Sequence, residues 1–136
     1  MVRPGTLLLA CLWILMALAV KAQSPDARLP VDEAQKLVEA VIYPNKSKAV
    51  LQQIHDPYQP DFIFFEAIDP NPDHSAHMGT FAVNPWTGDV WSPAGYCSRL
   101  TSSRLTAMLK SIRARSKLPA AEFDRLSAKK PICDAD

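Results

Sequence analysis

Apolar side chains recur every three to four positions along residues 32–42, which is the spacing of one face of an α-helix. They are Ala34, Leu37, Val38, Val41 and Ile42. Asp32 and Glu33 stand at the start of this repeat, where acidic groups favour the positive end of the helix dipole. Pro44 follows and cannot continue a helix. The pattern predicts a helix over residues 32–42.

A shorter apolar repeat follows in residues 47–55, with Val50, Leu51 and Ile54 as its apolar positions. Ser47 stands where a serine hydroxyl caps the beginning of a helix. This spacing predicts a second, shorter helix. The prolines that follow, in residues 56–60, end it and force an extended turn.

The central part of the chain changes to the patterns of β-strands. Residues 62–68 open with four consecutive apolar residues, which is typical of a strand buried on both faces. Residues 77–84 place Gly79, Phe81 and Val83 on one side of a second strand. A third strand begins at residues 90–92, beyond a turn rich in Pro, Asn and Gly. We expect the strands beside this turn to pair as an antiparallel hairpin, with Gly88 supplying a positive φ.

Helical spacing returns in the C-terminal part. Thr101 or Ser102 can cap a helix that runs to about residue 116. Its buried face consists of Leu105, Met108, Leu109 and Ile112. Pro119 fits the first position of a short final helix that reaches about residue 126.

These elements predict an α+β fold, in which a small antiparallel sheet of three to four strands carries helices packed on one face. The other face is either solvated or a binding surface. We expect the core to draw on apolar residues from every element. They are Leu37, Val41, Phe62, Phe64, Phe81, Val83, Leu105, Leu109 and Ile112.

Residues 1–22 have the pattern of a secretory signal peptide. Arg3 precedes an apolar run over residues 7–20, and Val20-Lys21-Ala22 resembles a small-residue cleavage site. The run is shorter than the ~20 residues of a membrane span. We expect a periplasmic or secreted single domain over residues 23–136, without stable membrane insertion. Lipidation at Cys11 and an uncleaved anchor are the alternatives.

Charge is distributed unevenly. Of 15 basic residues, Arg3 and Lys21 leave with the leader, so 13 remain against 14 acidic ones, a net of −1 that argues against nucleic-acid binding. Residues 23–98 carry a net of −6 and residues 99–130 a net of +7. Either the two halves pack together and their fields partly cancel, or the basic half faces an acidic partner or an anionic surface.

Two cysteines remain after the leader is removed, Cys97 and Cys133. In an oxidising compartment they are expected to form a disulfide between the start of the helix near residue 102 and the end of the chain. Closing such a loop stabilises a protein by roughly 3–4 kcal/mol in the chain-entropy model.

The binding candidates are aromatic. Trp86 and Trp91 flank the turn, and Tyr96 follows closely. Tryptophan and tyrosine are enriched where proteins bind partners. Their alternative role is to cover the open end of the sheet and protect the hairpin.

A metal site is the second functional candidate. His74 and His77 are spaced like metal ligands, with Asp69 and Asp73 in the same loop, as a small metal-binding protein or metal-dependent hydrolase would need. Glu66, in an apolar strand, suits a general acid if it is buried and a solvent-facing side chain otherwise. No catalytic motif is present in the sequence, so we expect a non-enzymatic protein without a cofactor.

The turn carries a family resemblance. Residues 83–90 match the strand–turn–strand pattern of PepSY-type bacterial domains at every position that the pattern specifies; the position of Trp86 accepts any residue. The helix over residues 32–42 also stands in the expected order. The resemblance implies a small exported α+β module associated with protease inhibition or with modulating a neighbouring domain. Independently of the resemblance, the small size, the expected export, the expected disulfide, the aromatic turn and the lack of catalytic motifs favour a protein that binds another exported protein, as an inhibitor or as an immunity protein against a toxin.

Overall fold

The computed structural model describes residues 28–42, 49–70, 73 and 76–133. The expected signal peptide and His74 lie outside these residues. Among the described helices, none combines the length and the apolar character that a membrane crossing requires.

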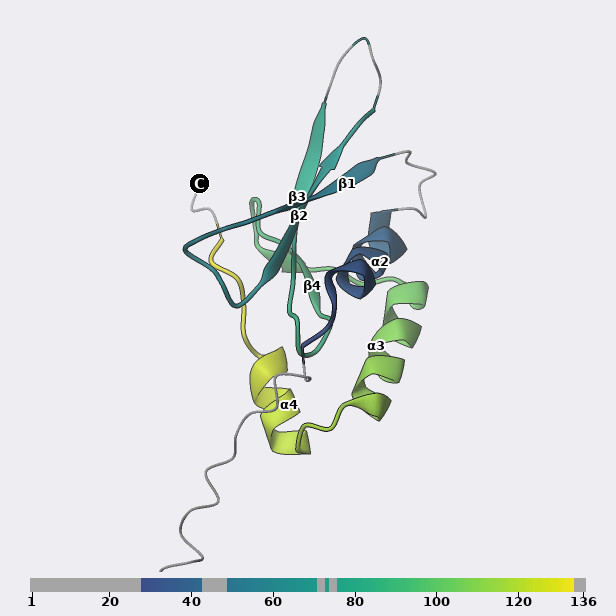
Figure 1. Cartoon of the computed structure of the whole chain (residues 1–136), viewed down its shortest axis with the longest axis vertical. Coiled ribbons are helices and arrows are strands. Elements are labelled where there is room, and N and C mark those ends of the chain that lie inside the picture. Colours follow the sequence, from purple (N-terminus) through teal and green to yellow (C-terminus); the bar gives the residue numbers. More distant parts are fainter. Residues whose placement is uncertain (1–27, 43–48, 71–72, 74–75, 134–136) are drawn as a thin grey trace, which may run out of the picture.

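The chain folds as an α+β unit, as predicted (Figure 1). Five antiparallel strands follow one another in the sheet in the order of the sequence. Within the described ranges, one helix precedes the sheet and two follow it. The elements are α2 (Val31–Ile42), β1 (Val50–Ile54), β2 (Ile63–Ile68), β3 (His77–Val83), β4 (Val90–Ser92), β5 (Ser98–Arg99), α3 (Ser103–Arg115) and α4 (Ala120–Ser127).

The helix predicted over residues 47–55 is wrong, because this part of the chain forms β1, the edge strand beside β2. Leu51 packs against the main core, whereas Ile54 packs against a second cluster on the opposite face. A separation of three residues places two side chains on opposite faces of a strand. The three-residue spacing of Leu51 and Ile54 therefore resembles that of a helix only by coincidence, since each side chain packs in a different cluster.

The sheet has one strand more than expected. β5 contributes two residues, and Arg99 pairs with Trp91 of β4. So short a strand leaves no alternating pattern for sequence analysis to detect. The segment between β4 and β5 reverses direction through Gly95 and Cys97, both of which have a positive φ.

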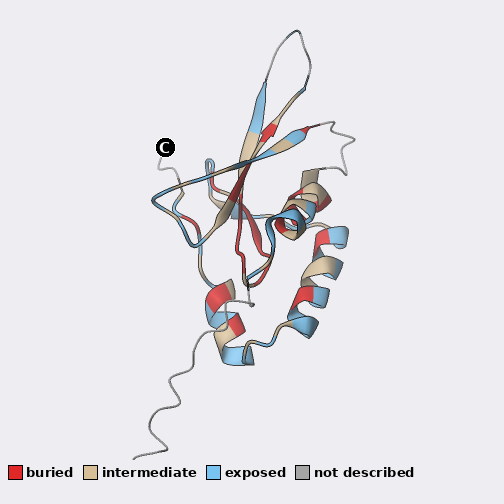
Figure 2. Cartoon of the chain, viewed as in Figure 1, coloured by how far each residue is buried: buried red, intermediate tan, exposed pale blue. Residues whose placement is uncertain are grey.

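The main core lies between the sheet and α2 and α3. Phe65, Val83 and Val90 point to this side, where Leu37 and Leu105 are fully buried. Figure 2 shows buried positions running along the strands into the turn between β3 and β4. Most of the predicted core residues are found here. The exceptions are Phe62 and Phe64, which belong to the second cluster on the other face of the sheet.

Gly88, in the turn after β3, has the positive φ that the sequence predicted, at 79°. A Cβ atom at this position would stand 2.7 Å from Ile112 Cδ1 and 3.0 Å from Leu37 Cδ1. Both α2 and α3 therefore pack directly against the backbone of the turn. A residue with any side chain would push the two helices away.

Candidate functional site

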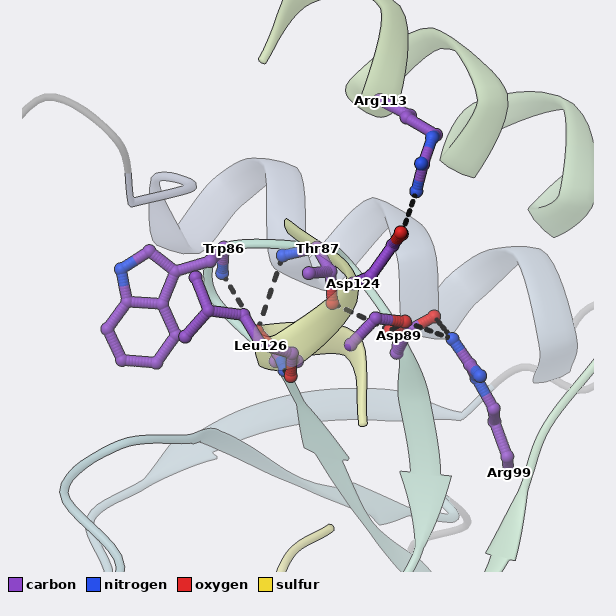
Figure 3. A network of polar contacts seen from close by, with 9 residues as sticks. Trp86, Thr87, Asp89, Arg99, Arg113, Asp124 and Leu126 are labelled. Carbon is purple, nitrogen blue, oxygen red and sulfur yellow. Dashed lines mark hydrogen bonds and ion pairs between the residues drawn. The ribbon is translucent and has the colours of Figure 1, made fainter. Parts of the chain in front are cut away.

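The turn between β3 and β4 is held by the side chain of Asn84, which is fully buried. Its Oδ1 accepts hydrogen bonds from the backbone N–H groups of Trp86, at 3.0 Å, and Thr87, at 3.3 Å. Its Nδ2 donates to the carbonyl oxygen of Leu126 in α4, at 2.8 Å (Figure 3). One side chain thus shapes the turn and fastens the last helix to it.

Asp89 is the second centre of this network and is only 3% exposed. Its Oδ2 accepts hydrogen bonds from the hydroxyls of Thr87 and Ser127, both at 2.7 Å. Its Oδ1 forms an ion pair with the guanidinium of Arg99 in β5. A buried carboxylate is tolerated when it is paired and hydrogen-bonded in this way. The polar residues that carry the PepSY resemblance are therefore occupied in maintaining the fold.

Trp86 is the residue of the turn that points outward. Figure 3 shows its indole projecting away from the polar network. Two cations lie over the ring, with Arg28 Cζ 5.1 Å and Lys129 Nζ 5.4 Å from the ring centroid. These distances are typical of cation–π contacts. The side chain is partly exposed, so it is reachable from solvent.

The loop between β1 and β2 joins the surroundings of Trp86. Lys129 Nζ lies 3.1 Å from the carboxylate of Asp61. Arg28 Nη2 donates to the carbonyl of Pro60 at 3.3 Å. The two cations that cover the indole are therefore both tied to residues 55–62.

The chain after α4, residues 128–133, is called the tail here. The backbone N–H of Ile132 donates to the side chain of Gln59 in the β1–β2 loop. Cys133 forms the predicted disulfide with Cys97, with their Cα atoms 5.6 Å apart. Figure 1 shows the tail running from α4 along the sheet, on the side away from α3. Two attachments, one polar and one covalent, hold it there.

Large side chains project from the segments that the tail connects. Tyr58 is 86% exposed, Ile132 is 66% exposed and Tyr96, beside the disulfide, is fully exposed. We use the name tail-side surface for the exposed parts of the tail and of the segments attached to it, which bear Tyr58, Trp86, Tyr96 and Ile132. Isolated exposed apolar residues are normal, but several on segments fastened to one another make a surface suited to a partner.

The structure separates the three predicted binding residues. Trp86 and Tyr96 lie on the tail-side surface. Trp91 is only 6% exposed and packs in the second cluster with Phe64 and Ala82. Its position therefore fits the alternative interpretation, in which an aromatic residue covers the sheet. Within the described part of the chain, the indole Nε1 of Trp91 has no hydrogen-bond partner.

Sequence analysis missed Tyr58 and Ile132. Tyr58 stands between two prolines, Pro57 and Pro60, a setting that indicates an exposed loop but not that the neighbouring Gln59 contacts the tail. Ile132 precedes Cys133, so the predicted disulfide already implied that its segment is held against the sheet. The hydrogen bond to Gln59 left no signal in the sequence.

The histidine loop is represented in the structure by His77. Its Nε2 lies 3.3 Å from Thr80 Oγ1 and 3.5 Å from Glu66 Oε1. Glu66 is about one-third exposed, so it corresponds to the solvent-facing interpretation and not to a buried acid. Among the described residues, no three or more His, Cys, Asp or Glu side chains are grouped as a metal site would require.

Some of the basic residues of the C-terminal half form ion pairs with acidic residues of the N-terminal half. Arg99 pairs with Asp89, Arg115 with Glu33 and Lys129 with Asp61. These contacts support the interpretation that the two fields partly cancel. Five Arg and Lys residues have no ion-pair partner in the described ranges, and all are exposed. They are Arg28, Arg104, Lys110, Lys117 and Lys130.

No protein-family model and no curated protein matches the chain. Among solved structures, it is similar to a chain in a type VI secretion system effector–immunity complex from Pseudomonas protegens. The TM-score is 0.61, the alignment covers 78% of this chain and 91% of that chain, and 19% of the aligned residues are identical. At this identity the similarity is one of fold.

Proposed function

We propose that this chain is an exported immunity-type protein that binds a protein toxin through the tail-side surface and so neutralises it. The observation that carries the proposal is the exposure of Tyr58, Tyr96 and Ile132 on segments that a disulfide and a hydrogen bond fix together. The shared fold with a chain of an effector–immunity complex supports it.

The tail-side surface has the physical character of a protein-binding site. Tyrosine and tryptophan bury large areas with few rotatable bonds, so they lose little entropy on binding. The disulfide between Cys97 and Cys133 holds the tail before any partner arrives, which lowers the cost of ordering it. These properties favour recognition of another folded protein.

The same disulfide supports export. Structural disulfides persist in oxidising compartments and are rare in the cytosol. Together with the signal peptide expected over residues 1–22, the disulfide favours a periplasmic or secreted location. The toxin would then be met outside the cytosol, before it reaches its target.

A protection assay tests the proposal. Cells that lack the chain are mixed with cells that produce it, and their survival is counted. The proposal predicts that cells without the chain are killed by neighbours and that supplying it restores their survival. Tyr58→Ala combined with Tyr96→Ala should fail to restore survival, whereas Val50→Ala, an exposed apolar residue on β1, should succeed. Equal survival with and without the chain would contradict the proposal.

A further inference from the structure

Arg28 combines three features that prepare it for an acidic group. Its guanidinium lies over the Trp86 indole at 5.1 Å, and one hydrogen bond to Pro60 O restrains its orientation. No acidic side chain pairs with it among the described residues. A guanidinium has five N–H donors in a planar fork that matches a carboxylate. Most of these donors remain available.

The surroundings of Arg28 are also cationic. Lys129 lies over the same indole at 5.4 Å, and Lys130 follows it in the tail without an ion-pair partner in the described residues. Within the described ranges, Asp61 is the one acidic side chain that forms an ion pair with this group, through Lys129. The positive charges around Trp86 therefore favour binding of a negatively charged group.

The other free cations lie in a different setting. Arg104 and Lys110 are exposed on α3, and Lys117 follows the helix. Their exposed neighbours on the helix are small residues, such as Ala107 and Ala114, together with Thr106 and the ion-paired Arg113 and Arg115. No exposed large apolar side chain accompanies them on α3. Such a face is typical of a solvated helix surface.

We infer that Arg28, Trp86 and Lys129 bind an acidic segment of the partner protein, with a carboxylate on the free donors of Arg28 and apolar contacts on the indole. This inference rests on the proposed function and adds the chemistry of the partner. The guanidinium is already positioned by the ring and by Pro60, so little rotamer freedom is lost when the carboxylate arrives. Charge-assisted pairs of this kind are stronger than neutral hydrogen bonds.

The probe is a hexaglutamate peptide whose termini are acetylated and amidated, so that only its side chains are charged. It is titrated into the disulfide-bonded protein at low ionic strength, where charge interactions are least screened. Chemical shifts of the backbone amides and of the tryptophan indoles report where it binds. We expect the largest shifts at the indole of Trp86 and at the amides near Arg28 and Lys129. A hexalysine peptide should leave these signals unchanged.

Two matched double variants separate this site from general attraction. Arg28→Gln with Lys130→Gln and Arg104→Gln with Lys110→Gln each remove two positive charges from exposed, unpaired positions. The first variant should weaken hexaglutamate binding by about tenfold, and the second should change it less than about twofold. Both should retain the amide spectrum of a folded protein.

Shifts centred on α3, equal losses in both variants, or no binding of hexaglutamate at all would overturn the inference. None of these results bears on the protection assay, which measures survival. If the chain protects cells but does not bind the acidic peptide at Trp86, the proposed function stands and the inference about partner chemistry fails. If the peptide binds and protection is absent, the proposed function fails.

Discussion

Asn84 donates a hydrogen bond from its side chain to the carbonyl oxygen of Leu126, 2.8 Å away and 42 residues later in the chain. This contact fixes the end of α4 beside the turn that carries Trp86. Since the tail starts directly after α4, the same bond sets the position from which the tail departs. The buried turn and the exposed tail-side surface are thereby mechanically connected.

Asn84→Ala should destabilise the protein by about 2–3 kcal/mol, because it removes three hydrogen bonds of a buried side chain, two within the turn and one to the carbonyl of Leu126. Denaturant unfolding measures the change. Gln35→Ala, which removes a single bond between neighbouring turns of α2, is the control and should cost less than about 1 kcal/mol. Equal effects of the two substitutions would contradict the assigned role of Asn84.

Gly88 and Gly95 provide a matched pair, since both have a positive φ, of 79° and 63°. Gly95→Ala adds a Cβ that meets nothing within 4 Å, so it should cost only about 1–2 kcal/mol of backbone strain. Gly88→Ala adds the same strain and also a clash with Ile112 and Leu37, so it should cost about 1–3 kcal/mol more. Similar melting temperatures for the two variants would show that the helices do not pack on this turn.

Trp86 and Trp91 should respond differently to substitution and to a quencher. Trp91→Ala removes a buried ring and should lower the free energy of unfolding by about 3–5 kcal/mol. Trp86→Ala should lower it much less, because Trp86 is partly exposed. Iodide, which is excluded from the interior, should quench the fluorescence of Trp86 and leave Trp91 largely unaffected. Protection from iodide at both residues would contradict the exposure of Trp86.

The disulfide should hold the tail as well as stabilise the fold. Its two cysteines are 36 residues apart, so replacing both with serine should cost about 4 kcal/mol in the chain-entropy model. Amide exchange of Lys130, Ile132 and Cys133 should accelerate more than that of α3 once the link is lost. Unchanged exchange in the tail would show that the hydrogen bond to Gln59 and the burial of Pro131 suffice to hold it.

The sequence predicted the parts of the fold that depend on periodic patterns. α2, α3 and α4 and the strands β2, β3 and β4 all lie within a few residues of their predicted positions. The β1 segment was misread because Leu51 and Ile54 each meet a different cluster across the sheet. That partition depends on pairing with β2, which local spacing cannot reveal.

The candidate site was predicted only in part. Trp86, Trp91 and Tyr96 were predicted as binding residues, but Trp91 is buried in the structure. The disulfide was predicted from the two cysteines that follow the leader. The place of Arg28 in the site depends on a long-range contact: its guanidinium lies over the ring of Trp86, which is 58 positions later in the sequence. Long-range contacts of this kind follow from the packing of α4 and the β1–β2 loop, which no sequence pattern encodes.

Hydrogen exchange on the complex between this chain and the toxin that we propose it neutralises tests the central claim most directly. The account predicts that binding slows amide exchange in residues 55–62, 93–97 and 128–133, the segments that bear Tyr58, Tyr96 and Ile132, and leaves the exposed face of α3 unchanged. Protection confined to α3 or to β1, with unaltered exchange in these three segments, would contradict it.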